Sequence, residues 1–101
     1  MKMTDIIVVR IYLTENSQLE TKIVDYLKSE KIKISGMSVF RAISGFGESG
    51  GSTASLVDLS LSLPLVIEFF DSDKEKINKS LEHLNEFVKP GHIVFWEAKT
   101  L

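Results

Sequence analysis

A run of glycines near the middle of the chain contains the residue types that bind phosphates and dinucleotides. It holds four of the six glycines, and Gly45-x-Gly47-x-x-Gly50 has the spacing of the dinucleotide-binding fingerprint. Asp71 follows at roughly the 20-residue distance where that fingerprint places an acidic residue. The fingerprint requires a helix directly after the glycines, however, and every second residue from Val57 to Phe69 is apolar, which predicts a strand. Dinucleotide binding of this type is therefore not expected.

The same run could still bind an anion through its backbone. Exposed amides of a glycine-rich turn can hold a phosphate, and Arg41 lies close enough in the sequence to pair with it. Lys89 is the second cationic candidate. A turn without any ligand is the alternative, and the residues alone leave both open.

Ser44 to Gly47 also match part of an RNA-recognition signature, K/R-G-F/Y-G/A-F-V-x-F/Y. Glu48 stands where the signature has a base-stacking aromatic residue, and Ser44 replaces its leading basic residue. The net charge of −2 at pH 7, without a basic run, also disfavours contacts with phosphate backbones. No nucleic-acid partner is expected.

No catalytic or metal-binding group can be assembled from the remaining polar residues. The two histidines are His83 and His92, and no carboxylates fall at spacings that would complete a metal cage with them. His83 and Glu86 are one helical turn apart and are interpreted as part of a solvated helix face. The serines of the glycine-rich run have no evident base nearby, and the chain has no cysteine. We therefore expect neither an enzyme nor a bound cofactor or metal ion.

Length and composition predict a single soluble domain that covers residues 1–101. The chain is 44% hydrophobic and 26% charged, without low-complexity segments or internal repeats. No apolar run reaches the ~18 residues of a membrane span, and the lack of cysteine fits a reducing compartment. A cytoplasmic location is therefore expected.

Apolar periodicity predicts six secondary-structure elements. Four strands are expected, at Ile6–Leu13, Ile34–Ser44, Leu65–Phe70 and His92–Ala98. Two helices are expected, each opened by an S-x-x-E capping box (Ser17 with Glu20, Ser72 with Glu75). The first should cover about Gln18–Glu30, and the second, in which Ile77, Leu81, Leu84 and Val88 recur at helical spacing, should end before Pro90-Gly91. The order predicts an α+β, ferredoxin-like βαββαβ fold, with a four-stranded antiparallel sheet and two helices on one face.

The predicted sheet also has apolar residues on the face that the helices leave open. These residues are Ile6, Val8, Tyr12, Phe40, Val66, Phe70, Val94 and Trp96. A contiguous apolar surface of this size normally marks an interface, so we expect self-association through it. The interface is expected to contain Tyr12, Val66, Glu68, Phe70 and Trp96. Arg10 should pair with Glu68, within one subunit or between two, because either charge alone would be destabilising there.

Several segments of the sequence resemble a known superfamily. Gly45 to Gly47, and Leu63-Pro64 leading into Val66 to Glu68, are similar to segments of the PII signal-transduction proteins. The resemblance is closer still to a PII-like family of about this length, which shares the runs Arg41 to Gly47, Asp58 to Ser60 and Leu63 to Asp71, followed by Lys76-Ile77 and Leu81. The resemblance implies a trimer that senses adenine nucleotides in clefts between subunits. It also implies a set of ligand-binding residues: Arg41, Gly45, Phe46, Gly47, Gly50, Lys89 and Gly91.

Two functions remain open at this point. The first is a PII-like regulatory or small-molecule-sensing homotrimer that binds an anionic effector, such as an adenine nucleotide, and signals through the loop 45–62. Some PII-like relatives are encoded near fluoride-channel proteins, which makes a membrane channel or transporter a candidate partner. The second function is a constitutive homo-oligomeric interaction module with no small-molecule ligand.

Overall fold

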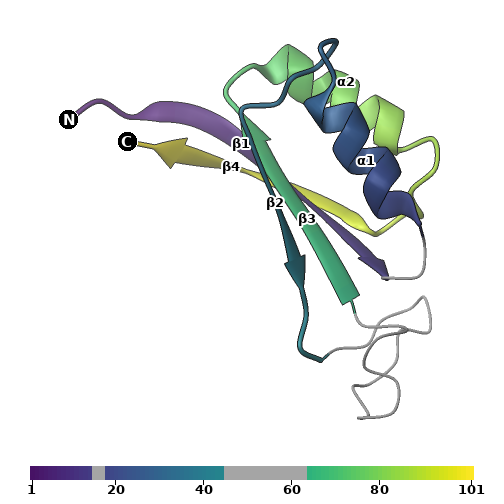
Figure 1. The fold of residues 1–101 in the computed structure, drawn as a ribbon. Helices are drawn as coiled ribbons and strands as arrows, with labels where there is room; N and C mark the ends of the chain where they lie inside the picture. Colours follow the sequence, from purple (N-terminus) through teal and green to yellow (C-terminus); the bar gives the residue numbers. More distant parts are fainter. Residues whose placement is uncertain (15–17, 45–63) are drawn as a thin grey trace.

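The computed structural model of the chain describes residues 1–14, 18–44 and 64–101. Its elements are, in chain order, β1 (Thr4–Thr14), α1 (Leu19–Lys28), β2 (Gly36–Arg41), β3 (Pro64–Asp71), α2 (Lys74–Leu84) and β4 (Ile93–Thr100). The strands form one sheet, and both helices pack on the same face of it (Figure 1). The predicted βαββαβ order and the α+β class are therefore confirmed.

The strands are arranged in the order β2-β3-β1-β4, and each neighbouring pair is antiparallel. The two central strands, β1 and β3, are the most continuously apolar ones, as strands with a neighbour on each side usually are. β2 and β4 form the two edges. The chain termini lie side by side because Thr4 of β1 is paired with Thr100 of β4 (Figure 1).

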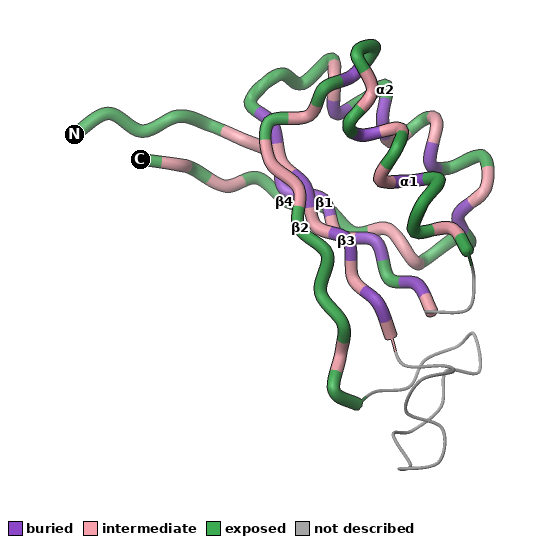
Figure 2. The backbone as a smooth tube through the Cα atoms, in the orientation of Figure 1, coloured by how far each residue is buried: buried purple, intermediate pink, exposed green. Residues whose placement is uncertain are grey.

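The hydrophobic core lies between the sheet and the helices. Alternate residues of the central strands are buried, as are residues along each helix, and these residues form the core cluster (Figure 2). Its best-buried members are Val9, Ile11, Leu65, Ile67 and Phe69 from the sheet and Ile23, Leu27, Ile77 and Leu84 from the helices. Strand alternation and helical spacing predicted this division of the sequence.

The helix boundaries differ from the prediction in detail. α2 is capped by Asp73 and not by Ser72, because the Asp73 carboxylate accepts hydrogen bonds from the amides of Glu75 at 2.9 Å and Lys76 at 3.3 Å. Asp and Ser cap helices about equally well, so the sequence pattern alone did not decide between adjacent candidates. α2 also ends at Leu84, although the helical spacing was predicted to continue through Val88 to a stop before Pro90. α1 begins after Gln18, and Ser17 of its predicted capping box lies outside the described residues.

His83 does not lie on a solvated helix face, so that prediction was wrong. Its ring is half-buried and stacks on Tyr26 of α1, with 4.1 Å between the ring centroids. Phe87 packs edge-on against the same ring at 5.4 Å. Helical spacing within α2 does not reveal that a side chain from α1 covers this position.

Candidate functional site

Arg41 and His92 lie at the same end of the sheet. Arg41 is the last residue of β2 and is paired with Leu65 of β3, which is paired in turn with Leu13 of β1. On the other side of β1, the Tyr12 amide donates to the His92 carbonyl at 2.9 Å. This is the end at which β2 leads into the glycine-rich run (Figure 1).

Arg41 and Lys89, the two cationic residues predicted to bind an anion, lie at opposite edges of this sheet end. Arg41 belongs to β2, whereas Lys89 precedes β4, and the strands β3 and β1 lie between them. Neighbouring strands are about 4.8 Å apart, so the two edges are separated by roughly 14 Å. The fold of one chain therefore does not bring the two positions together.

A tight turn presents Lys89 and Gly91 just before β4. The His92 amide donates to the Lys89 carbonyl at 3.1 Å, which closes the turn. Gly91 has a φ of 86°, in the left-handed region that costs other residues about 1–2 kcal/mol. Space does not require the glycine, because no atom lies within 4 Å of a Cβ built there. The backbone conformation is therefore what favours glycine at this position.

Two cavities flank Lys89. The α2–β4 pocket has a volume of about 360 Å³ and is lined by Leu81, Glu82, Asn85, Lys89, Pro90, Gly91, Ile93 and Phe95. The β1–α1 pocket has about 270 Å³ and is lined by Tyr12, Leu13, Thr14, Leu19, Phe87, Val88, Lys89 and His92. Both combine apolar walls with a few polar groups, which is typical of small-molecule sites. The structure thus places the predicted ligand residues Lys89 and Gly91 at a cavity.

Four other predicted ligand residues lie outside the described residues: Gly45, Phe46, Gly47 and Gly50. The rest of the segment up to Leu63 lies outside them as well. Only the two ends of this segment are described. They are held together by a hydrogen bond of 2.9 Å from the Ala42 amide to the Pro64 carbonyl. The ligand-binding role of the glycines stays a prediction.

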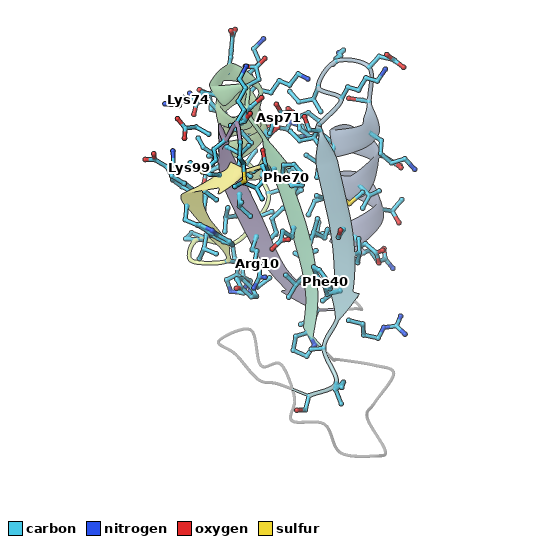
Figure 3. All side chains as sticks on the ribbon, turned by 90° about the vertical axis from the view of Figure 1, so that its left-hand side faces the viewer. Arg10, Phe40, Phe70, Asp71, Lys74 and Lys99 are labelled. Atoms are coloured by element: carbon cyan, nitrogen blue, oxygen red, sulfur yellow. The ribbon has the colours of Figure 1, made fainter. Side chains whose placement is uncertain are left out.

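The open face of the sheet carries all five residues predicted to form an interface. Tyr12 is paired with Val66, Arg10 with Glu68, and Val8 with both Phe70 and Trp96. Tyr12 and Trp96 are 39% and 41% exposed in the single chain. Figure 3 looks onto this face, where the labelled Arg10, Phe40 and Phe70 come from three different strands. The face therefore has apolar residues from every strand, with a polar row of Ser38, Glu68 and Arg10 across its middle.

Arg10 and Glu68 neutralise each other within this apolar face. The Arg10 Nε donates to the Glu68 Oε1 at 2.7 Å, which confirms the predicted pair within one chain. The guanidinium also lies 5.6 Å from the centroid of the Trp96 ring, within cation–π range. The hydrogen bond to Glu68 is the main cause that raises the pKa of Arg10. A second apolar surface could therefore cover this face without burying an unpaired charge.

Asp71, the acidic residue at the fingerprint distance, lies at the opposite end of the sheet from Arg41. It ends β3 and is only 3% exposed. Its carboxylate is occupied by hydrogen bonds from Ser35 and Asp73, so it does not belong to the candidate site.

Six of the eight residues that line the α2–β4 pocket were not predicted to bind a ligand, and three of these six, Glu82, Asn85 and Phe95, carry groups that could contact one. Phe95 is on the sheet face that the helices cover, as alternation predicted, but it is 59% exposed because the helices do not reach the β4 edge. Glu82 and Asn85 are exposed positions that the helical pattern does not distinguish from ordinary surface. A large aromatic residue on an edge strand was the one sequence signal that could have identified this pocket.

The described part of the chain lacks two features, a metal-binding cluster and a membrane-spanning helix. Residues 1–14, 18–44 and 64–101 contain no group of three or more His, Asp or Glu side chains that could share a metal ion. Within these ranges, neither helix has the length and apolar character needed to cross a membrane.

Comparison with known proteins identifies the family. The model of the DUF190 family, described as "Uncharacterized ACR, COG1993", matches residues 6–100. The chain belongs to this family. A UPF0166 protein of Methanocaldococcus jannaschii is 34% identical over 92 residues, which cover 86% of this chain and 82% of that protein.

Solved structures with the same fold come from PII-like proteins. A suggested PII-like signaling protein from Thermus thermophilus matches with a TM-score of 0.66 at 20% identity, over 99% of this chain and 91% of that one. CPII of Thiomonas intermedia, a nitrogen regulatory PII-like protein bound to ADP, AMP and bicarbonate, matches with a TM-score of 0.67 at 16% identity, over 99% and 97% of the two chains. This DUF190 chain therefore has a PII-like fold, and the predicted relationship to a PII-like family is confirmed.

Proposed function

We propose that the protein is a PII-like regulatory homotrimer that binds an anionic effector, foremost an adenine nucleotide, in clefts between its subunits. The observation that carries this proposal is the position of Arg41 and the turn 89–91. They lie at the same end of the sheet but at opposite edges. An anion site that uses both would have to be completed by a second chain.

Both sheet edges have features of strands that are covered in an assembly. Val39 and Phe40 of β2 are 40% and 49% exposed, and they point to opposite faces of the sheet. At the other edge, Val94 and Trp96 of β4 are each 41% exposed on the open face. Edge strands of monomers are usually protected by proline, lysine or bulges, and the middle of β2, from Gly36 to Phe40, has none of these. Pairing with a second copy would cover both edges.

The strand directions allow this pairing. β2 and β4 run in opposite directions, because three antiparallel pairings separate them. If a second copy of the chain is rotated about an axis parallel to the strands, its β2 can therefore pair with β4 of the first copy in antiparallel orientation and continue the sheet. Such a head-to-tail contact closes into a ring when the rotation fits, and it brings Arg41 of one subunit to the turn 89–91 of the next. The trimeric number comes from the resemblance to PII proteins.

The open face supports assembly independently. In a closed ring with the helices outside, the apolar residues of the open face would be buried. At ~25 cal/mol per Å², about 600 Å² of apolar surface hidden per subunit corresponds to roughly 15 kcal/mol before the costs of association are subtracted. This observation also favours the second candidate, a constitutive interaction module with no ligand.

The choice of effector rests on chemistry and on the comparison. Arg41 and Lys89 suit phosphate oxygens, and the Thiomonas intermedia protein of the same fold is bound to ADP and AMP. In this proposal the loop 45–62 transmits the bound state to a protein partner, with a membrane channel or transporter as the candidate. The protein would act in the cytoplasm as a regulator and not as an enzyme. Deleting residues 52–60, which leaves the expected ligand residues Gly45, Phe46, Gly47 and Gly50 in place, is expected to abolish capture of the partner without changing nucleotide affinity.

Titration calorimetry and light scattering test the proposal together. The expected result is a particle of three 11.4 kDa chains that binds ATP, ADP or AMP saturably below millimolar concentration. A trimer that binds none of them at millimolar concentration would leave the interaction module as the function. A stable 11.4 kDa monomer would contradict both the trimer and its clefts.

A further inference from the structure

The α2–β4 pocket has a chemical composition that the proposed anion site does not explain. Phosphate binding at this turn needs only Lys89 and the backbone near Gly91. The same pocket also contains the ring of Phe95, the carboxylate of Glu82 and the amide of Asn85. These three groups have the chemistry that recognises the base and the sugar of a nucleoside.

We infer that the α2–β4 pocket is the nucleoside subsite of the protein, with Phe95 stacking on the base, Asn85 selecting adenine and Glu82 binding the ribose. This inference rests on the proposed function and specifies which part of the chain reads the ligand. The pocket volume of about 360 Å³ is at the small end of the ~300–1,000 Å³ typical of ligand sites. That size suits a nucleoside whose phosphates extend outward past Lys89.

Phe95 can serve as the platform for the base. Its side chain is 59% exposed although it lies on the sheet face that carries the core, so the core does not account for it. Ile93 and Leu81 continue the apolar wall beside it. Aromatic side chains stack on every base, so this contact supplies affinity without selecting among bases.

Asn85 can supply the selection. A carboxamide donates one hydrogen bond and accepts another, which matches the N7 acceptor and the N6 amino donor of adenine. Guanine offers two acceptors, N7 and O6, on the same edge, so it leaves the amide oxygen unpaired. The backbone amide of Asn85 caps α2. Its side chain has no hydrogen-bond partner among residues 1–14, 18–44 and 64–101, so its amide group is available to a ligand.

Glu82 and Lys89 fix the direction of the ligand. A carboxylate accepts hydrogen bonds from ribose hydroxyls and repels phosphate, whereas the lysine attracts phosphate. Neither side chain has an ion-pair partner within the described ranges, so neither charge is already neutralised. The sugar is therefore held near α2 and the phosphates near Lys89 and Gly91, where the proposed assembly adds Arg41 of the next subunit.

Titration of the trimer with ADP and GDP tests the role of Asn85. The wild-type protein is expected to prefer ADP, and Asn85→Ala is expected to weaken ADP about tenfold, equivalent to one buried hydrogen bond, and to bring the ADP-to-GDP ratio close to one. Asn78→Ala is the matched control, because Asn78 is exposed on the same helix and lines neither pocket at Lys89. Arg41→Ala should weaken both nucleotides equally and leave the ratio unchanged.

The second measurement isolates the stacking contact. Phe95→Ala should weaken ADP and GDP alike by about tenfold or more, whereas Phe95→Tyr should stay within about threefold of the wild type because the ring is retained. Light scattering on the same samples establishes that the assembly is intact. If Phe95→Ala alters the assembly, Asn85→Ala decides the question, because Asn85 is outside the sheet.

The outcomes separate this inference from the proposed function. Intact trimers of Asn85→Ala and Phe95→Ala that bind ADP as the wild type does would overturn the nucleoside subsite and leave the nucleotide-binding trimer standing. A wild-type trimer that binds neither ADP nor GDP would overturn both.

Discussion

Asp71 accepts two hydrogen bonds from Ser35, one from its backbone amide at 2.9 Å and one from its hydroxyl at 3.0 Å. The other carboxylate oxygen, Oδ1, accepts from the Asp73 amide at 2.8 Å. The Lys76 Nζ lies 3.8 Å from Oδ2, the oxygen that accepts from Ser35. Asp71 thereby ties the approach to β2 and the start of α2 to the end of β3. Burial alone would raise the pKa of this carboxyl, but the hydrogen bonds and Lys76 lower it overall.

Asp71→Asn is expected to reduce the free energy of unfolding by about 1–3 kcal/mol. An amide has only one acceptor oxygen, so its NH₂ group would face one of the backbone donors that the carboxylate now satisfies. Urea unfolding at pH 7 measures the loss. Asp25→Asn is the control, because Asp25 is exposed on α1 and should change stability by less than about 0.5 kcal/mol. Equal stability of the two variants would contradict this role of Asp71.

The same carboxylate predicts part of the acid sensitivity of the protein. Its pKa in the folded protein is lower than the ordinary 3.8, so the charged form stabilises the fold above that value. The stability should fall as the pH drops from about 4 through the lowered pKa, because the folded protein must then take up a proton against its hydrogen bonds. Urea unfolding between pH 2 and 7 should show a shallower acid decline for Asp71→Asn than for the wild type. Parallel declines would show that other carboxylates dominate.

The close approach of the Phe70 ring to Gly36 leads to a second prediction about stability. A Cβ at Gly36 would lie 2.4 Å from Phe70 Cε2, so Gly36→Ala must displace the ring on the open face. The expected cost is about 1–3 kcal/mol, as for other overpacked sites. Combining Gly36→Ala with Phe70→Leu should cost less than the sum of the two single changes, because the smaller side chain removes the clash. Additive costs in urea unfolding would contradict this explanation.

The sequence predicted those parts of the fold that depend on periodicity. β1 and β3 alternate regularly, so the assignment of Val8 and Val66 to the open face implies that the opposite parity, with Ile11 and Ile67, is the buried one, as the structure shows. The cap of α2 was misplaced by one residue because Ser72 and Asp73 are both good capping residues, and only the geometry of the turn selects between them. Contacts between distant elements, such as Tyr26 with His83, have no signature in either local pattern.

The candidate site could be predicted by residue type but not by arrangement. Arg41, Lys89 and Gly91 were named in advance as ligand residues by their type, and that role stays a prediction. The strand order that puts Arg41 and Lys89 at opposite edges depends on long-range pairing, which residue type does not record. Because Val94 and Trp96 were assigned to the open face, alternation puts Phe95 on the opposite face, but it cannot show that the helices leave the β4 edge largely uncovered. Its exposure follows from the positions of whole elements, which no local pattern records.

Arg41→Ala is expected to weaken binding of an adenine nucleotide by about 1.5–3 kcal/mol, the range of a hydrogen bond to a charged group. The proposed cleft puts this side chain beside the phosphates, so AMP should lose less affinity than ATP. Calorimetric titration measures both. Lys28→Ala is the control, because Lys28 is an exposed cation at the far end of α1 from the site. Equal effects of the two substitutions would indicate general charge attraction and not a specific contact.

The open face gives the last prediction, which concerns assembly. Trp96→Asp and Val66→Asp each put a charge into the apolar surface around the Arg10–Glu68 pair, which already has balanced charges. If that surface is buried between subunits, an unpaired charge there costs about 3–5 kcal/mol, so both variants should dissociate or unfold. Lys79→Asp is the control, because it affects only an exposed pair with Glu75 that is worth about 0.3–0.5 kcal/mol. Light scattering at micromolar concentration should show the wild type and Lys79→Asp as the same assembly and the other two as monomers or aggregates. Trp96→Asp and Val66→Asp proteins that keep the wild-type mass and stability would show that the open face is not the interface.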